Sequence, residues 1–199
     1  MELKDEILDR EMIYKLSPEE LDKRLILKKW RMNNLYYFVN EAGEKKPFIF
    51  NYIQSRIYEE ARGLKKVAIL KYRQGGVSTY KIIDLLDNTL FAGNNRNSYF
   101  VTHRQDLLDE FFKKAKFTYE TMEPRIKAIL SKPKTDNANE LYFADSNNTI
   151  KVSLDVRGKN PTDIHVSEFA WMTPEKQKEL YVAMNEFREA RITIETTAN

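Results

Sequence analysis

Short apolar runs alternate along the chain with longer segments in which apolar residues recur at helical spacing. Residues 67–70 form a run of the kind that is buried in a parallel sheet, and the apolar positions from Ile82 to Leu90 predict a helix after it. Residues 98–102 predict the next strand, and residues 107–115 the next amphipathic helix. Because strand alternates with helix, the pattern predicts an α/β fold with a central, mostly parallel sheet flanked by helices.

The region before these units has a pattern of its own. Ser17, Pro18 and Glu20 form a capping box with proline at the first helical position, which predicts helices near the N-terminus. We therefore expect an N-terminal helical extension over residues 1–46 and an α/β core over residues 47–199.

The second half of the core adds a hairpin and further strands. Residues 141–143 and 149–152 predict a hairpin inserted between the regular units. Residues 164–166 and 191–195 predict core strands with a capped helix between them. Because the sequence ends directly after the last of these strands, we expect the natural fold to continue beyond Asn199.

The composition limits the chemistry more than it identifies it. Of the 199 residues, 42% are hydrophobic, which is enough for one well-buried core. The net charge of +3 neither indicates nor excludes a nucleic-acid partner. The absence of cysteine excludes disulfides, zinc fingers and thiol catalysis, and the imidazoles of the sequence are His103 and His165. Carboxylates, hydroxyls, amides and cations must therefore carry the chemistry.

The sequence predicts neither a membrane span nor a secretory signal. No stretch approaches about 18 uninterrupted apolar residues, the length of a spanning helix. The charged first residues lack the apolar region of a signal peptide. We expect a protein that is neither secreted nor held in a membrane.

The segment between the first predicted core strand and its helix has the features of a phosphate-binding loop. Gly75 and Gly76 let backbone N–H groups approach a phosphate, and the positive end of the helix dipole favours its negative charge. Ser78 or Thr79, at the start of the helix, can then ligate magnesium. The alternative interpretation is an ordinary strand-to-helix turn in which one of these hydroxyls caps the helix.

This loop departs from the common pattern G-x-x-x-x-G-K-[ST], because Lys71 stands at the first glycine position and Val77 at the lysine position. Residues 73–79, R-Q-G-G-V-S-T, instead resemble the R-Q-x-G-x-S-T loop of terminase large subunits, the motors that package DNA in tailed bacteriophages. In that family a basic residue earlier in the loop replaces the lysine, which here implies Lys71 or Arg73. The resemblance implies nucleotide contacts by Lys71, Arg73, Gln74, Gly75, Gly76, Val77, Ser78 and Thr79.

The segment from Pro47 to Gln54 resembles the adenine-binding segment of the same family. There a glutamine amide pairs with the base edge through one donor and one acceptor, which implies this role for Gln54. The alternative interpretation is that Asn51 and Gln54 form a helix-capping pair.

The segment from Ile164 to Glu168 resembles the acidic strand end of the family, in the form H-x-S-E. The resemblance implies that Glu168 is the catalytic base that polarises the attacking water. Ser167 stands where such ATPases usually carry aspartate, which implies that it contacts magnesium through water, while Ser78 binds the metal. The alternative is an exposed glutamate at a strand end. We expect His165 to pack within the strand.

Two further segments extend the resemblance. Arg157 lies in an R-G element before the acidic strand, which implies stabilisation of the γ-phosphate charge, in its own subunit or a neighbour's. Arg104 and Arg125 are weaker candidates for an arginine finger, because exposed arginines usually have no role beyond the protein surface.

The last segment of the sequence, T-T-A-N, resembles the family's coupling motif. The alternative interpretation is that these are ordinary polar residues at the end of a strand. The resemblance implies coupling roles for Thr196, Thr197 and Asn199.

The motifs occur in the order that they have in the family, and the resemblance implies a P-loop NTPase core of the RecA-like (ASCE) class. It implies that this core binds ATP and Mg²⁺ and hydrolyses ATP to drive double-stranded DNA into a procapsid. It implies as partners the viral DNA, the portal protein of the procapsid and the terminase small subunit, with an assembled homo-oligomeric ring and a monomer for the isolated chain. It implies a place of action in the host cytoplasm. Because the acidic cluster of the family's nuclease domain has no counterpart in the sequence, we expect no DNA cleavage by this chain alone.

The sequence leaves alternative functions open. A helicase or DNA-remodelling ATPase of related core would use the same motifs without a portal. A nucleotide-binding assembly module that has lost hydrolysis is suggested by Val77 and Ser167, the positions that depart from the usual pattern.

Overall fold

The computed structural model describes residues 2–130, 132–137, 139–156 and 160–197. Its centre is a seven-stranded sheet with the strand order β3-β9-β8-β4-β7-β6-β5. The parallel strands are β3 (Lys66–Lys71), β9 (Arg191–Thr197), β8 (Asp163–Val166), β4 (Asn97–Val101) and β7 (Asn148–Ser153). The antiparallel strands are β6 (Glu140–Phe143) and β5 (Pro133–Asn137). The predicted α/β fold with a mostly parallel sheet is confirmed.

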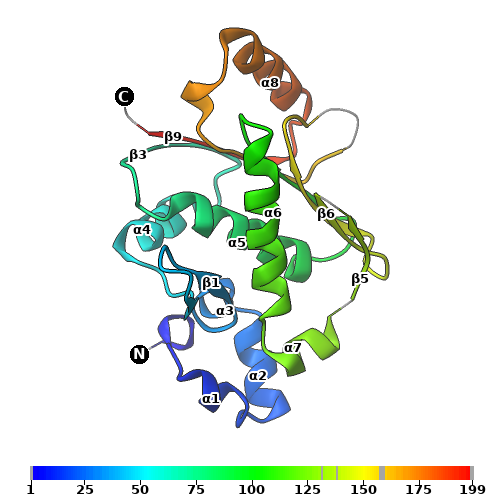
Figure 1. The fold of residues 1–199 in the computed structure, drawn as a ribbon. Coiled ribbons are helices and arrows are strands. Elements are labelled where there is room, and N and C mark those ends of the chain that lie inside the picture. Colours follow the sequence, from blue (N-terminus) through cyan, green and yellow to red (C-terminus); the bar gives the residue numbers. More distant parts are fainter. Residues whose placement is uncertain (1, 131, 138, 157–159, 198–199) are drawn as a thin grey trace.

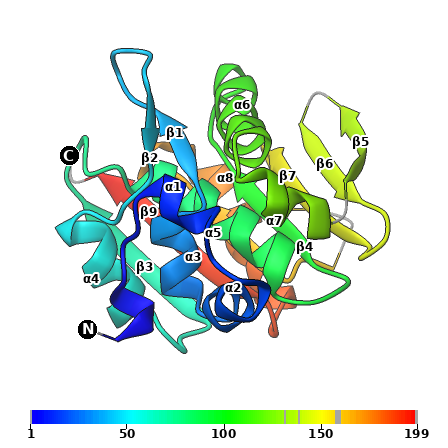
Figure 2. The ribbon, with the colours of Figure 1, turned by 90° about the horizontal axis from the view of Figure 1, so that it is seen from below.

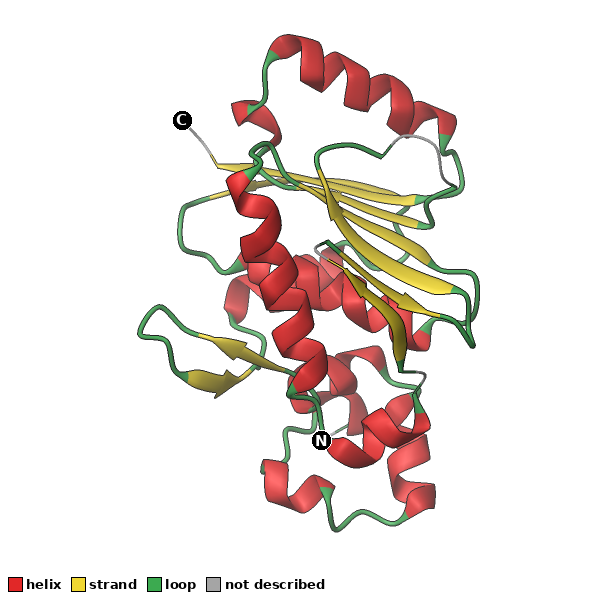
Figure 3. Cartoon of the chain, turned by 45° about the vertical axis from the view of Figure 1, so that its right-hand side comes forward, coloured by secondary structure: helices red, strands yellow, loops and turns green. Residues whose placement is uncertain are grey.

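Helices cover both faces of this sheet (Figures 1 and 3). The helices α5 (Val77–Phe91) and α6 (Asp106–Glu120) lie on one face, and α8 (Pro174–Glu186) lies on the other. Along β4 the buried side chains alternate between these layers, since Phe100 packs in the cluster of α5 and α6 and Tyr99 and Val101 pack in that of α8. β4 is thus buried on both faces, as expected for an interior strand of a parallel sheet.

The N-terminal part of the chain is helical, as predicted, and packs on α5. Its helices are α1 (Arg10–Ile13), α2 (Pro18–Leu25) and α3 (Lys28–Asn34), followed by α4 (Tyr52–Glu60). Short 3-10 helices lie at Leu3–Asp5 and Phe169–Trp171. The Ser17–Glu20 capping box is formed at the start of α2, and Trp30 and Met32 of α3 are fully buried. Figures 1 and 2 show α1, α2 and α3 beneath α5, on its side away from the sheet.

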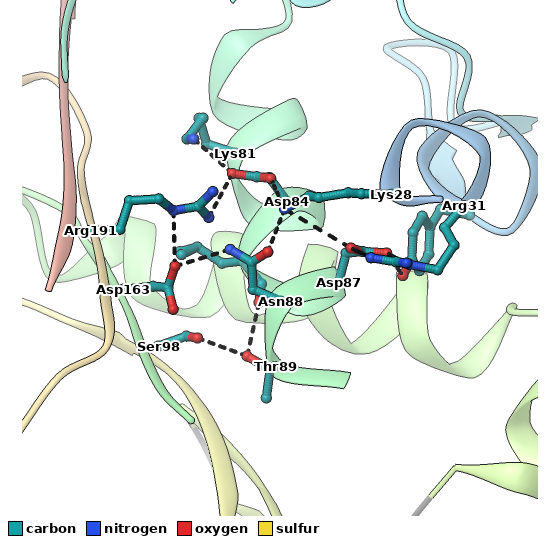
Figure 4. A network of polar contacts seen from close by, with 12 residues as sticks. Lys28, Arg31, Lys81, Asp84, Asp87, Asn88, Thr89, Ser98, Asp163 and Arg191 are labelled. Carbon is teal, nitrogen blue, oxygen red and sulfur yellow. Dashed lines mark hydrogen bonds and ion pairs between the residues drawn. The ribbon is translucent and has the colours of Figure 1, made fainter. Parts of the chain in front are cut away.

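A network of buried charges joins α3, α5 and the sheet (Figure 4). Arg31 forms a bidentate pair with Asp87, at 2.8 and 2.7 Å. Asp84 lies 2.5 Å from Lys28 Nζ, 2.7 Å from Lys81 Nζ and 3.3 Å from Arg191 Nη2. We call this network, at the amino ends of β8 and β9, the amino-end cluster; its charged members are Lys28, Arg31, Lys81, Asp84, Asp87, Asp163 and Arg191.

The structure also differs from the sequence-based expectations. β3 is a strand, but it lies at the edge of the sheet, so the prediction of a fully buried strand is wrong: Leu70 is 74% exposed. The sequence pattern did not predict α7 (Pro124–Ile129), β5 or the hairpin of β1 (Tyr37–Val39) and β2 (Lys45–Pro47). This hairpin spans the predicted boundary between extension and core, which stays a prediction. None of the described helices has the length and apolar character needed to cross a membrane.

Candidate functional site

The loop between β3 and α5 lies at the carboxyl ends of the parallel strands, where α/β sheets bind their ligands. Gly76 caps α5 in the left-handed region, with φ of 68°. A Cβ atom at this position would lie 2.8 Å from Gln54 Nε2, closer than real contacts allow. The backbone conformation of Gly76 therefore favours glycine, and a side chain at this position would also displace the end of Gln54.

Gln54 and Asn51, at the start of α4, hold this loop in place. Together they form a capping box, in which Gln54 Oε1 accepts from Asn51 N at 3.0 Å. Gln54 Nε2 donates to Gly76 O at 3.0 Å, and Asn51 Nδ2 donates to Gly75 O at 3.3 Å. Both atoms of the Gln54 amide are thus engaged within the chain, and the residue is 5% exposed. Contact of Gln54 with adenine stays a prediction and would require these bonds to be exchanged.

Six polar side chains from four segments meet beside the loop. Lys71 Nζ lies 2.9 Å from Glu168 Oε1 and 3.6 Å from Glu195 Oε2, and it donates to Ser78 Oγ at 3.4 Å. Arg73, the other candidate cation, is solvent-exposed in the loop. We call the six side chains that meet beside the loop the carboxyl-end cluster. Its members are Lys71, Ser78, His165, Ser167, Glu168 and Glu195.

Glu195 of β9 is at the centre of the cluster and was missed as a site residue by the sequence reasoning. Its Oε1 accepts from Ser78 Oγ at 2.6 Å and from Ser167 Oγ at 2.8 Å, and the residue is fully buried. Burial raises its pKa, but the His165 imidazole, the Ser78 hydroxyl and the Lys71 charge outweigh burial and hold the pKa of Glu195 at about 2. An available signal was the carboxylate itself, since an acidic residue within an apolar core strand is unusual.

Glu168 follows β8 in the left-handed conformation, with φ of 54°, which is uncommon for a residue with a side chain. Its Oε2 accepts from Thr197 N at 3.1 Å and from Thr197 Oγ1 at 3.0 Å. Burial raises the pKa of Glu168, but the bond with Lys71 and those from Thr197 lower it below its usual range. The carboxylate is therefore ionised at neutral pH and joins the loop cation to the end of β9.

The residues of the predicted coupling motif lie against the segment that follows Glu168. Trp171 Nε1 donates to Thr197 Oγ1 at 3.1 Å, and Ala170 N donates to Thr196 Oγ1 at 3.3 Å. Thr197 thus contacts both Glu168 and Trp171. Asn199 lies outside the described residues.

The predicted arginines are not in the cluster as far as the chain is described. Arg157 lies outside the described residues. Arg104 is exposed and pairs with Asp106. Arg125 donates to Tyr14 O at 2.6 Å and to Leu16 O at 3.3 Å, so it is engaged with the N-terminal region.

The oxygen atoms of the cluster suit magnesium better than a softer metal. The described residues contain no group of three or more His, Cys, Asp or Glu side chains that could hold a metal ion. Ser78 and Ser167 contribute hydroxyls, and Glu195 contributes a carboxylate whose buried Oε2 accepts no hydrogen bond from the described residues. Hard oxygen donors of this kind, completed by water and phosphate oxygens, are what Mg²⁺ binds.

The fold is that of known phage terminases. The structure is similar to that of the large terminase of bacteriophage HK97, with a TM-score of 0.61 and 13% identity over 76% of this chain and 34% of that chain. It is also similar to the large terminase ATPase domain of Thermus phage P74-26, with a TM-score of 0.58 and 14% identity over 76% of this chain and 66% of that one. At these identities the likeness establishes a shared fold. No family model matches the sequence, and no curated protein matches it significantly.

Proposed function

We propose that this chain is the ATPase core of a phage terminase large subunit, which hydrolyses ATP to move double-stranded DNA into a procapsid. The observation that carries the proposal is the meeting of Lys71, Ser78 and Glu168 beside a glycine loop at the carboxyl ends of β3 and β8. The fold shared with two terminases supports it. We place the extension over residues 1–46 and the ATPase core over residues 47–199.

The chemistry follows from the position of each side chain. Bound Mg²⁺ and ATP supply the metal charge and the phosphoryl group to be transferred. The N–H groups of Gly75 and Gly76 would bind phosphate oxygens at the start of α5, and Ser78 Oγ would hold the metal. Lys71, 2.9 Å from Glu168, exchanges this carboxylate for phosphate oxygens in the loaded site. Glu168, once freed, accepts a proton from the attacking water.

The remaining residues couple and complete the reaction. Thr197 binds Glu168 through its backbone and its hydroxyl, so a change at this carboxylate reaches the end of β9 directly. We propose the same coupling role for Thr196 and Asn199. Arg157, or an arginine of a neighbouring subunit, stabilises charge on the transferred group. Gln54 would turn its amide to the adenine edge, and Ser167 would contact the metal through water.

The proposal includes the partners of a packaging motor. DNA would be gripped through its backbone, which predicts sequence-independent and salt-sensitive binding. The assembled form is a ring of identical subunits on the portal of the procapsid, supplied with DNA through the terminase small subunit in the host cytoplasm. We propose no DNA cleavage by this chain.

A second candidate is a nucleotide-binding assembly module without hydrolysis. One observation favours it: in the structure Glu168 is held by both Lys71 and Thr197, so its carboxylate is not free to activate water. The two candidates differ in turnover and agree in nucleotide binding.

The Glu168→Gln variant distinguishes them. We expect it to retain affinity for a fluorescent ADP analogue and to lose about 100- to 10,000-fold in ATP turnover, because glutamine cannot accept the proton. The matched control is Glu189→Gln, which removes the same charge from an exposed residue at the opposite end of the sheet.

The outcomes of this experiment are distinct. Binding without turnover in the unaltered protein, assembled on its portal, favours the module. Turnover that survives Glu168→Gln removes Glu168 as the base. A chain that does not bind the nucleotide at all contradicts both candidates.

A further inference from the structure

The site lacks a carboxylate where P-loop ATPases place one. In those enzymes Mg²⁺ is held by the hydroxyl at the start of the loop helix and by an aspartate at the end of the acidic strand. Ser78 supplies the hydroxyl here, but Ser167 takes the aspartate position and has no charge. The charge has to come from elsewhere in the fold if the metal is to be held in the same way.

The strand order brings such a charge to the site. β9 lies between β3, which leads into the loop, and β8, which ends before Ser167. Glu195 on β9 therefore reaches Ser78 on one side and Ser167 on the other, at 2.6 and 2.8 Å. A single carboxylate links the hydroxyls of both motifs.

The direction of these hydrogen bonds suits a metal site. Each hydroxyl has one proton and two acceptor lone pairs. Because Ser78 and Ser167 both donate to Glu195, the lone pairs of each hydroxyl remain for accepting, and one pair on Ser78 accepts from Lys71 Nζ at 3.4 Å. Glu195 thus orients the Ser78 hydroxyl so that its oxygen can act as a metal ligand.

One carboxylate oxygen of Glu195 is buried without a hydrogen-bond partner among the described residues. Removing an ionised carboxylate from water costs several kcal/mol, which close ion pairs and full hydrogen bonding must offset. Glu195 Oε2 accepts no hydrogen bond from the described residues, and the Lys71 ammonium lies 3.6 Å from it. His165 Nε2 lies 3.6 Å from Oε1, beyond hydrogen-bond distance. Two carboxylates, Glu168 and Glu195, therefore share the single ammonium of Lys71.

We propose that Glu195 is the carboxylate that positions Mg²⁺ at this site, through Ser78 and in place of the aspartate that Ser167 replaces. This inference rests on the proposed function. Glu195 acts as a positioning residue: it orients the Ser78 hydroxyl and supplies the negative charge beside it. Ser167 holds Glu195 from the other side.

The Glu195→Gln variant tests the proposal through metal affinity. Glutamine keeps the shape and an acceptor oxygen but removes the charge. We expect the affinity for Mn²⁺, measured by electron paramagnetic resonance with ADP present, to fall about 10- to 100-fold. The affinity for ADP without metal should stay within about twofold, because no phosphate contact is changed. Glu189→Gln, at an exposed residue, serves as the control and should change neither value.

Rescue makes the test specific. In the double variant Ser167→Asp/Glu195→Gln the charge returns at the usual position, and we expect Mn²⁺ affinity to recover to within about threefold of the unaltered protein. If Glu195→Gln does not fold, the double variant decides: recovery supports the proposal, and a folded double variant without metal affinity overturns it.

A measurement on the unaltered protein covers the case in which neither variant folds. Mn²⁺ added with ADP should broaden the side-chain carboxyl carbon resonance of Glu195 and leave that of Glu189 sharp. A Glu195 resonance that stays sharp while Mn²⁺ binds, or unchanged Mn²⁺ affinity in Glu195→Gln, overturns this inference and leaves the proposed function standing. A protein that binds no nucleotide contradicts the proposed function itself.

Discussion

The chain buries charge at both ends of its parallel strands, and the two clusters differ in how completely their polar atoms are paired. In the amino-end cluster Asp84 contacts Lys28, Lys81 and Arg191, and Asp87 accepts both arms of Arg31. Within the described chain, no buried side-chain atom of this cluster lacks a hydrogen-bond partner. In the carboxyl-end cluster, Glu195 Oε2 and both ring nitrogens of His165 lack one.

This difference separates a structural network from a site. Buried polar groups are nearly always paired, so a fully paired cluster holds elements together, whereas the unpaired buried atoms beside the glycine loop leave room for a further partner. The backbone agrees with this distinction, because Gln74 and Glu168 around the carboxyl-end cluster have positive φ although neither is glycine. Strained residues of this kind concentrate at functional sites.

The largest effect is expected from Asp84→Asn in the amino-end cluster. This substitution leaves Lys28, Lys81 and Arg191 without their shared carboxylate, whose pKa they hold well below its usual range against the opposing effect of burial. Removing one partner of a buried charge network costs about 3–5 kcal/mol of unfolding free energy, measured by urea denaturation. Glu168→Gln, which breaks the Lys71 pair at the other end, should cost less. An equal or larger loss of unfolding free energy in Glu168→Gln would contradict the distinction between the two clusters.

A smaller effect is expected when acid titrates the carboxyl-end cluster. The pKa of Glu195 is about 2 in the folded chain, against 4.5 for the ordinary group. The carboxylate therefore stabilises the fold above about pH 4.5, by an amount on the order of 3 kcal/mol, and this contribution is lost as the pH falls toward 2.

The measurement is the unfolding free energy between pH 7 and pH 2, in the unaltered protein and in Glu195→Gln. The variant lacks the titrating group, so its stability should fall less steeply across this range. Asp84 is present in both chains, so its own acid titration cancels in the difference. Parallel curves would mean that the contacts of Glu195 do not lower its pKa in the folded chain.

The alternation of strand and helix was predictable because it depends on local periodicity. The strands β4, β8 and β9 and the helices α5, α6 and α8 appear where apolar spacing predicts them. The strand order was not predictable, since pairing β9 with both β3 and β8 joins residues far apart in sequence. For this reason Ser78 and Ser167 could be named from motifs, but their common partner Glu195 could not.

The environment of α5 shows a second limit. Its apolar positions predict an amphipathic helix with a solvated polar face. In the structure Asp84 and Asp87 on that face are buried, because α3 covers them with Lys28 and Arg31. No local pattern indicates this cover, because it depends on where the N-terminal helices dock.

The smallest effect is expected from strain in the loop itself, in Gly76→Ala. With φ of 68°, alanine at this position costs about 1–2 kcal/mol. Its Cβ would also lie 2.8 Å from Gln54 Nε2, which must move and weaken its bond to Gly76 O, at a further cost of about 1 kcal/mol. Gly43→Ala is the matched control, since its φ is 78° and nothing lies within 4 Å of its added Cβ.

The difference between the two alanine variants isolates the Gln54 contact, because both carry the same backbone penalty. We expect Gly76→Ala to be less stable than Gly43→Ala by about 1 kcal/mol in urea denaturation. Only Gly76→Ala should lower the affinity for ADP, since only its loop lies in the proposed phosphate site. In a Gln54→Ala background the clash is gone, so the stability difference should shrink. A difference that persists there would mean that the loop is held by contacts other than the one from α4.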